Sequence, residues 1–191
     1  IPKPVNLNKE RGLIIKNLII AVLSIVFVCF ITTSLFANSY DHEVKAKNMT
    51  FAWKIDGDTL HAKMSAKTKG WVGLGFNPSN KMKDANFILG YVKDGEAQVV
   101  DHFGSKETGH EADSKGGGSD DVTLVAGSED KGFTVIEFTI PINSGDKMDG
   151  ALSADGDTIL LLAYGPDRDS LKPRHKFKKT MTVNLATGAS K

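Results

Sequence analysis

The stretch GWVGLGFNPSNKMKDANFILGYV, residues 70–92, decides how we interpret this chain. Its two apolar runs, separated by a polar loop, are typical of two strands joined by a loop. Successive side chains of a strand point to opposite faces, so Trp71, Gly73 and Gly75 share one face and the intervening apolar residues share the other. Glycine weakens a strand unless another group must approach its backbone closely. A flat cofactor is one such group.

The chain around this stretch alternates in the same way. Apolar residues at every second position over residues 51–64, interrupted by the turn Asp56-Gly57-Asp58, predict a β-hairpin. Residues 104–121 are polar and glycine-rich, and we expect a long loop there. No stretch after residue 40 carries an apolar helical face. The pattern predicts nine or ten short strands in an all-β, antiparallel sandwich or barrel.

Composition limits the classes of function. The 191 residues suffice for one domain plus an appendage, and the net charge of +1 does not favour a nucleic-acid partner. The only cysteine, Cys29, lies in an apolar run near the N-terminus. The folded part therefore has neither a disulfide nor a thiolate metal site.

Residues 1–37 are interpreted as a cytoplasmic stub followed by a signal peptide or membrane anchor. Basic residues precede an uncharged run from Leu18 to Ala37, which is long enough to span a membrane. A cleaved signal would have a shorter apolar core. Either way, we expect the β domain to be exported, in the cell envelope or secreted. Residues 38–47 are expected to form a tether and residues 187–191 a tail.

Met82 is the first candidate ligand. Most methionines fill cores. Met82, however, lies in a polar loop, where an apolar side chain has no obvious packing role. A thioether suits a soft or borderline metal and is an axial ligand of haem iron.

His175 is the second candidate, in the basic segment LKPRHKFKK at residues 171–179. A solvated loop is the plain interpretation. The alternative is that its imidazole is a second axial ligand. The neighbouring basic side chains would then neutralise haem propionates or present a docking face for an acidic redox partner.

A divalent-metal cluster is a third possibility, set against simple solvation of the same side chains. It would draw on His102, His110, Asp101, Glu107, Glu111 and Asp113. The chain has no phosphate-binding glycine loop, nucleophile elbow, CxxCH or HExxH motif. Any haem would therefore be held non-covalently.

These motifs resemble the DOMON domain over about residues 48–186. The resemblance rests on GWVGLGFNP, the methionine loop, ANFILGYV, and the later segments at residues 101–103, 120–122, 132–134 and 136–138. It implies an immunoglobulin-like antiparallel β-sandwich that binds haem b or sugars.

The resemblance also implies the ligands. In haem-binding members similar to the cytochrome domain of cellobiose dehydrogenase, a methionine and a histidine hold the iron, at positions that match Met82 and His175. In the related haem subunit of ethylbenzene dehydrogenase the second ligand is a lysine, which leaves Lys172, Lys176 and Lys178 as alternatives. The family often has an acid where this chain has Asn86. Candidates for the pocket wall are Trp71, Phe76, Phe87 and Tyr91.

We therefore expect a membrane-tethered or exported b-type cytochrome domain that transfers one electron at a time to or from a redox partner protein. It would be no enzyme by itself. The main alternative is a carbohydrate- or ligand-binding DOMON module without redox activity. A third is a structural or adhesion sandwich.

Overall fold

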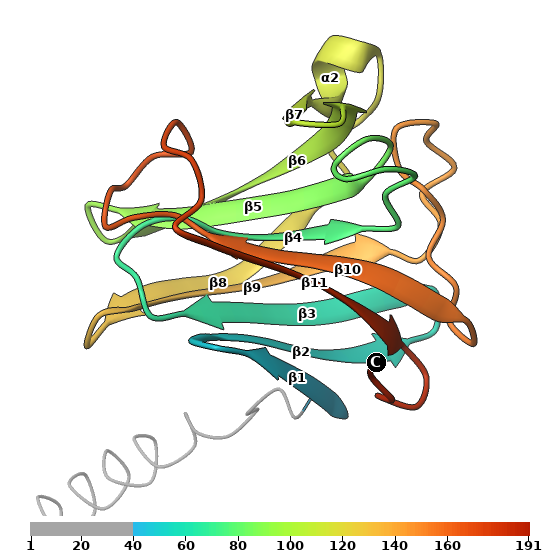
Figure 1. Cartoon of the computed structure of the whole chain (residues 1–191), viewed down its shortest axis with the longest axis horizontal. Helices are drawn as coiled ribbons and strands as arrows, with labels where there is room; N and C mark the ends of the chain where they lie inside the picture. Colours follow the sequence, from blue (N-terminus) through green and yellow to red (C-terminus); the bar gives the residue numbers. More distant parts are fainter. Residues whose placement is uncertain (1–39) are drawn as a thin grey trace, which may run out of the picture. The chain divides into compact units, whose positions relative to one another are not determined.

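A computed structural model describes residues 40–191, which form two antiparallel β-sheets packed face to face (Figure 1). The five-stranded sheet has the order β1-β2-β3-β9-β8, and the six-stranded sheet the order β11-β10-β4-β5-β6-β7. The all-β antiparallel sandwich predicted from the sequence is confirmed. The strands are β1 His42–Ala46, β2 Met49–Asp56, β3 Thr59–Ala66, β4 Val72–Phe76, β5 Asn86–Lys93, β6 Glu96–Lys106, β7 Gly109–Ala112, β8 Thr123–Asp130, β9 Phe133–Pro141, β10 Asp157–Tyr164 and β11 Phe177–Asn184.

The core lies between the two sheets, where the inward residues of each strand meet. Phe51 stacks on Trp53 with ring centroids 4.7 Å apart, and the edge of Phe76 from the opposite sheet approaches Phe51 at 6.2 Å. The Trp53 indole N–H is buried and donates to the Leu185 carbonyl at 2.8 Å. The alternation in the sequence therefore corresponds to a real inner face, on which the Trp53 indole N–H has a hydrogen-bond partner.

Tight turns with glycine set the strand register. The predicted hairpin over residues 51–64 is confirmed as β2–β3, and Gly57 takes the positive φ at its turn. Asp94 and Gly95 both have positive φ, 52° and 83°, between β5 and β6. This is the pattern of a two-residue hairpin turn whose twist matches that of the strands.

Two segments differ from the sequence-based expectation. The predicted tether at residues 38–47 contains β1, which pairs with β2 because its Val44 and Ala46 can be buried. The predicted loop at residues 104–121 contains the end of β6, then β7 and one short helix, α2 Asp113–Gly116. Among residues 40–191 this is the only helix, and it has four residues.

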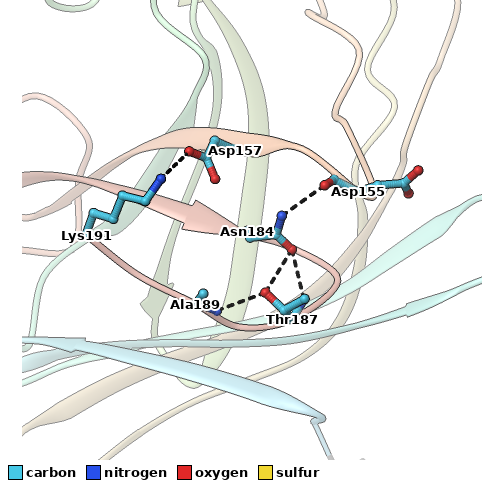
Figure 2. A network of polar contacts seen from close by, with 6 residues as sticks. All are labelled: Asp155, Asp157, Asn184, Thr187, Ala189 and Lys191. Carbon is cyan, nitrogen blue, oxygen red and sulfur yellow. Dashed lines mark hydrogen bonds and ion pairs between the residues drawn. The ribbon is translucent and has the colours of Figure 1, made fainter.

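The predicted tail folds back onto the sheet (Figure 2). The Asn184 side chain donates to the Asp155 carbonyl and accepts from the Thr187 hydroxyl. Lys191 pairs with Asp157 at 2.8 Å on the surface. The backbone of Lys191 also pairs with Thr182, so the last residues lie beside the edge strand β11.

No helix within residues 40–191 is long and apolar enough to cross a membrane. The predicted signal peptide or anchor at residues 1–37 lies outside the described residues.

Candidate functional site

The outer face of the six-stranded sheet is apolar around β4 and β5. Trp71, Phe87 and Leu89 lie there and are only 7%, 7% and 4% exposed, yet they do not belong to the core between the sheets. Along each strand of a sandwich, the residues that point outward are normally polar. This apolar outer face, which we call the glycine face because Gly73 and Gly75 line it, is the candidate site predicted from the sequence.

Neighbouring side chains cover the two glycines. A Cβ placed on Gly73 would collide with the Leu89 side chain and would lie 3.4 Å from the Trp71 ring. A Cβ on Gly75 would lie 2.5 Å from the Phe87 ring. The glycines thus permit a close approach, as predicted, and in this structure the groups that approach are the chain's own side chains.

Met82 is half-buried in the loop between β4 and β5. Its backbone N–H donates to the Glu107 carbonyl at 3.3 Å, and a Cβ on Gly104 of β6 would collide with its carbonyl. The methionine loop is therefore held against the end of β6 by backbone contacts.

His175 is exposed in the loop between β10 and β11. The Trp71 indole N–H donates to the Pro173 carbonyl at 3.0 Å, and the Lys176 N–H donates to the Tyr164 carbonyl at 2.8 Å. Trp71 therefore anchors the histidine loop at the start of β4. Exposed basic residues surround His175, and none of them forms an ion pair within residues 40–191.

The structure does not bring Met82 and His175 together. The methionine loop follows the last residue of β4, whereas the histidine loop leaves β10 beside the first residue of β4 (Figure 1), and β4 spans roughly 13 Å over its five residues. The strands beside the two loops, β6 and β11, are also separated by β5, β4 and β10. The pairing of these two residues as axial ligands stays a prediction.

The predicted pocket-wall residues fall on both faces of the sheet. Trp71 and Phe87 lie on the glycine face, and Tyr91 shares the outward direction of Phe87 along β5. Phe76 instead points into the core, fully buried beside Phe51. Because Phe76 lies in phase with Val72 rather than with Trp71, it cannot line the same pocket.

The chemistry of the donors fits haem iron. A thioether and an imidazole are a known axial pair, and the basic side chains near His175 match the charge of propionates. Met82 and His175 would hold the group, with Trp71 and Phe87 beside it. For both donors to reach one iron atom, the two loops must come closer than they are in this structure.

A second cluster consists of three aspartates and differs from the mixed histidine and carboxylate cluster predicted from the sequence. Asp101 of β6, Asp113 at the start of α2 and Asp149 of the 142–156 loop each place a carboxylate oxygen within 4.8 Å of the others. Asp101 and Asp113 are 3% and 1% exposed. We call these three residues the aspartate cluster.

The carboxylates of the aspartate cluster destabilise one another's charged forms. Burial first, then the neighbouring Asp149 and Asp113, raises the pKa of Asp101 to about 8. Burial, followed by repulsion from nearby acids, raises the pKa of Asp113 to about 7. The pKa of Asp149 is raised to about 6, also chiefly by burial. Charges crowded in this way call for a cation or for protons.

The predicted mixed histidine and carboxylate cluster divides between the two faces of β6. Asp101 points inward with its partner Ile88, and His102, the next residue, points outward. His102 and His110 are linked through their Nδ1 atoms at 2.8 Å, and His110 lies 5.3 Å from the Phe87 ring. Burial lowers the pKa of both, that of His102 to about 4, and so favours the neutral form of each imidazole. Asp149 was not among the predicted ligands, because it is distant in sequence from the other two aspartates and no motif marks it.

Comparison with known proteins places this arrangement in a family. The model of the DOMON domain matches residues 45–165, more than half of the chain. The chain belongs to the DOMON domain family. The family resemblance inferred from the glycine strand and the methionine loop is thereby confirmed.

Relatives carry the DOMON segment within much longer proteins. Mouse DBH-like monooxygenase protein 1 is 30% identical over 115 residues, which cover 60% of this chain and 18% of the relative. The human protein of the same name is 24% identical over 133 residues, covering 70% of this chain and 21% of the relative. The chain thus spans about a fifth of the length of the curated relatives it matches.

Solved structures with this DOMON fold include two cytochrome domains. The cytochrome b domain of pyranose dehydrogenase from Coprinopsis cinerea has a TM-score of 0.58 at 12% identity, covering 73% of this chain and 78% of its own. The cytochrome domain of Myriococcum thermophilum cellobiose dehydrogenase has a TM-score of 0.53 at 11% identity, covering 77% and 82%. At this identity the likeness establishes the fold.

Proposed function

We propose that this DOMON domain is a haem b module that transfers single electrons to or from a redox partner. The observation that carries the proposal is the apolar glycine face, where Trp71, Phe87 and Leu89 are nearly buried on the side of a sheet that normally meets water. A loop with a thioether and a loop with an imidazole adjoin the two ends of β4. The shared fold of two cytochrome domains supports the same assignment.

The chain's own residues would have separate roles. Met82 and His175 would hold the haem iron, and a haem ligated by two side chains would supply electron transfer rather than oxygen chemistry. Trp71 would keep the histidine loop in position through its bond to Pro173. The exposed basic residues near His175 would meet propionates or an acidic partner. With residues 1–37 as an export signal or anchor, this would take place outside the cytoplasm.

A second candidate is a ligand-binding DOMON module without redox activity, for example one that binds carbohydrate. The packing of Leu89 and Phe87 over the glycines favours it, because these side chains take the space that a haem edge would need. The separation of Met82 from His175 favours it as well.

A visible spectrum separates the two candidates. The purified full-length protein is titrated with haem, reduced, and compared with Met82→Ala and His175→Ala. We expect sharp low-spin α and β bands in the wild type and their loss in each variant, because one axial ligand is gone. Met148→Ala and His61→Ala are matched controls in other parts of the fold and should retain the bands.

The other outcomes are equally informative. A wild-type protein without low-spin bands after haem is supplied overturns the haem proposal, and binding on a glycan array would then support the second candidate. Bands that survive in His175→Ala but vanish in Lys176→Ala or a neighbouring lysine variant would assign the second ligand to lysine.

A further inference from the structure

We propose that Asp101, Asp113 and Asp149 form a binding site for a hard divalent cation, with Ca²⁺ as the expected ion. The site lies where β6, α2 and the 142–156 loop meet (Figure 1). It is separate from the glycine face, because Asp101 points to the opposite side of the sheet from His102 and Phe87. The proposal does not depend on haem.

The first observation is convergence from three separate segments. The register of β6 directs Asp101 inward beside the core residue Ile88. Asp113 begins α2, and its carbonyl accepts from the Gly118 N–H at 2.9 Å, which closes the turn after the helix. Asp149 comes from the connection between β9 and β10. Their ligand oxygens all lie within 4.8 Å of one another, close enough to share one ion.

The second observation is that the buried oxygens lack partners. Asp113 is 1% exposed, and neither of its carboxylate oxygens meets a hydrogen-bond donor among residues 40–191. The same holds for Oδ1 of Asp101 and Oδ1 of Asp149. A buried carboxylate without a donor costs several kcal/mol, roughly, unless it is neutralised or coordinates a metal. The two unpartnered oxygens of Asp113 are therefore suited to bind a cation.

Within residues 40–191, no cationic side chain lies at ion-pairing distance from the aspartate cluster. A fourth aspartate plays a different part, because Asp146 accepts from the N–H and the hydroxyl of Ser119 and so joins the 142–156 loop to the segment after α2. Asp121 donates its backbone N–H to the remaining oxygen of Asp101 at 3.1 Å. These bonds hold the acids together without neutralising them.

The donor set selects the class of ion. Three carboxylates with no nitrogen or sulfur donor suit hard cations rather than zinc or copper. Ca²⁺ accepts irregular sets of oxygen ligands, including bidentate carboxylates, from flexible loops, whereas Mg²⁺ retains several waters in an octahedron. Side chains that are 1% and 3% exposed leave little access for such waters. We therefore expect Ca²⁺ to bind more tightly than Mg²⁺.

Calorimetry tests the proposal on the full-length protein after chelator treatment, at pH 8. We expect one equivalent of Ca²⁺ to bind. The Tm should rise by about 5–10 °C at a hundredfold excess of Ca²⁺ over Kd. Asp113→Asn and Asp149→Asn should each weaken Ca²⁺ binding by about tenfold or more, because a ligand charge is removed.

A matched control variant and a second measurement distinguish the loss of a ligand from misfolding. Asp157→Asn removes an exposed carboxylate already paired with Lys191 (Figure 2) and should bind Ca²⁺ like the wild type. In chelator, Asp113→Asn should be at least as stable as the wild type, because it removes one of the mutually repelling charges. A loss of stability in chelator would mean that Asp113 serves the fold without a cation.

Three results would overturn the site. The first is no heat and no change in Tm at about 10 mM CaCl₂, well above the dissociation constants of weak extracellular calcium modules. The second is equal Ca²⁺ binding by the wild type and both cluster variants. The third is tighter binding of MgCl₂ than of CaCl₂, which would contradict the assignment of the ion.

Discussion

The glycine face and the aspartate cluster differ in how their potential ligands are arranged. The family resemblance names Met82 and His175 as the donors of the glycine face. Their loops lie at opposite ends of β4, and apolar side chains cover the surface between them. In the aspartate cluster the donors already converge within 4.8 Å, and Oδ1 of each of the three residues is buried without a hydrogen-bond partner among residues 40–191.

The difference reflects the chemistry of the side chains in each site. Leu89 and Phe87 lie over the two glycines, and apolar side chains that cover one another gain burial. Carboxylates do not gain in this way, because burial without a cation leaves their charges repelling one another. An apolar site therefore has no unpaired group to mark it, whereas a cluster of buried carboxylates is marked by unpartnered oxygens and raised pKa values.

The largest effect should follow from opening the glycine face with Phe87→Ala. Phe87 is 7% exposed and covers Gly75, so its removal should lower the free energy of unfolding without haem by about 3–5 kcal/mol. If haem uses this face, adding haem should restore much of the lost stability. Chemical denaturation with and without haem measures both quantities, and Phe133→Ala, an exposed phenylalanine on β9, is the control.

Gly104→Ala tests the methionine loop without touching Met82. The new Cβ would collide with the Met82 carbonyl, and a backbone group cannot swing aside as a flexible side chain can. We expect a loss of about 1–3 kcal/mol in the free energy of unfolding, with a displaced loop. Gly95→Ala matches the change in size at a turn with open space, although its positive φ adds some strain. If Met82 ligates iron, Gly104→Ala should also reduce low-spin haem, and Gly95→Ala should not.

The pH dependence of stability tests the charge repulsion that distinguishes the aspartate cluster from the glycine face. Folding raises the pKa of Asp113 to about 7, above its ordinary value near 4, so the folded state holds a proton that the unfolded state releases. The associated stability is complete below pH 4 and is lost as the pH rises to about 7.

Thermal unfolding in chelator between pH 4 and pH 8 checks this sign. The Tm of the wild type should fall, relative to Asp113→Asn, by about 3 °C or more over this range, the shift that 1 kcal/mol produces in a domain of this size. Added Ca²⁺ should offset the fall most at pH 8. A constant difference in Tm between the two proteins across the range would contradict the electrostatic account.

The smallest effect should come from the surface pair at the C-terminal tail. Asp157→Asn breaks the exposed bond to Lys191, and we expect a change of at most about 1 kcal/mol in the free energy of unfolding. Denaturation in low and high salt measures it. A larger loss would mean that the tail contacts in Figure 2 stabilise the sandwich more than their exposure suggests.

The alternation of apolar and polar residues predicted much of the fold, because the periodicity of a strand depends only on residues that are neighbours in the sequence. The β2–β3 hairpin and the division of β4 into a glycine side and a core side follow from it. The same alternation in β6 places the adjacent residues Asp101 and His102 on opposite faces, so a single metal cluster containing both could have been excluded from the sequence pattern.

The positions of the loops could not be predicted in this way. That His175 lies far from Met82 depends on β10 pairing with β4 and on β11 forming the edge of the sheet. That Asp149 joins Asp101 and Asp113 depends on the path of the 142–156 loop after β9. Neither arrangement has a local signature, since both arise from pairing between segments distant in sequence.

The distance between the two donor loops tests the haem account most directly. This distance can be measured in the full-length protein by pulsed electron paramagnetic resonance, with spin labels on Lys83→Cys and Arg174→Cys in a Cys29→Ser background. The account predicts a long distance without haem and a clearly shorter one with haem, because Met82 and His175 must reach the same iron. Haem binding that leaves the distance unchanged would contradict the ligation by this pair.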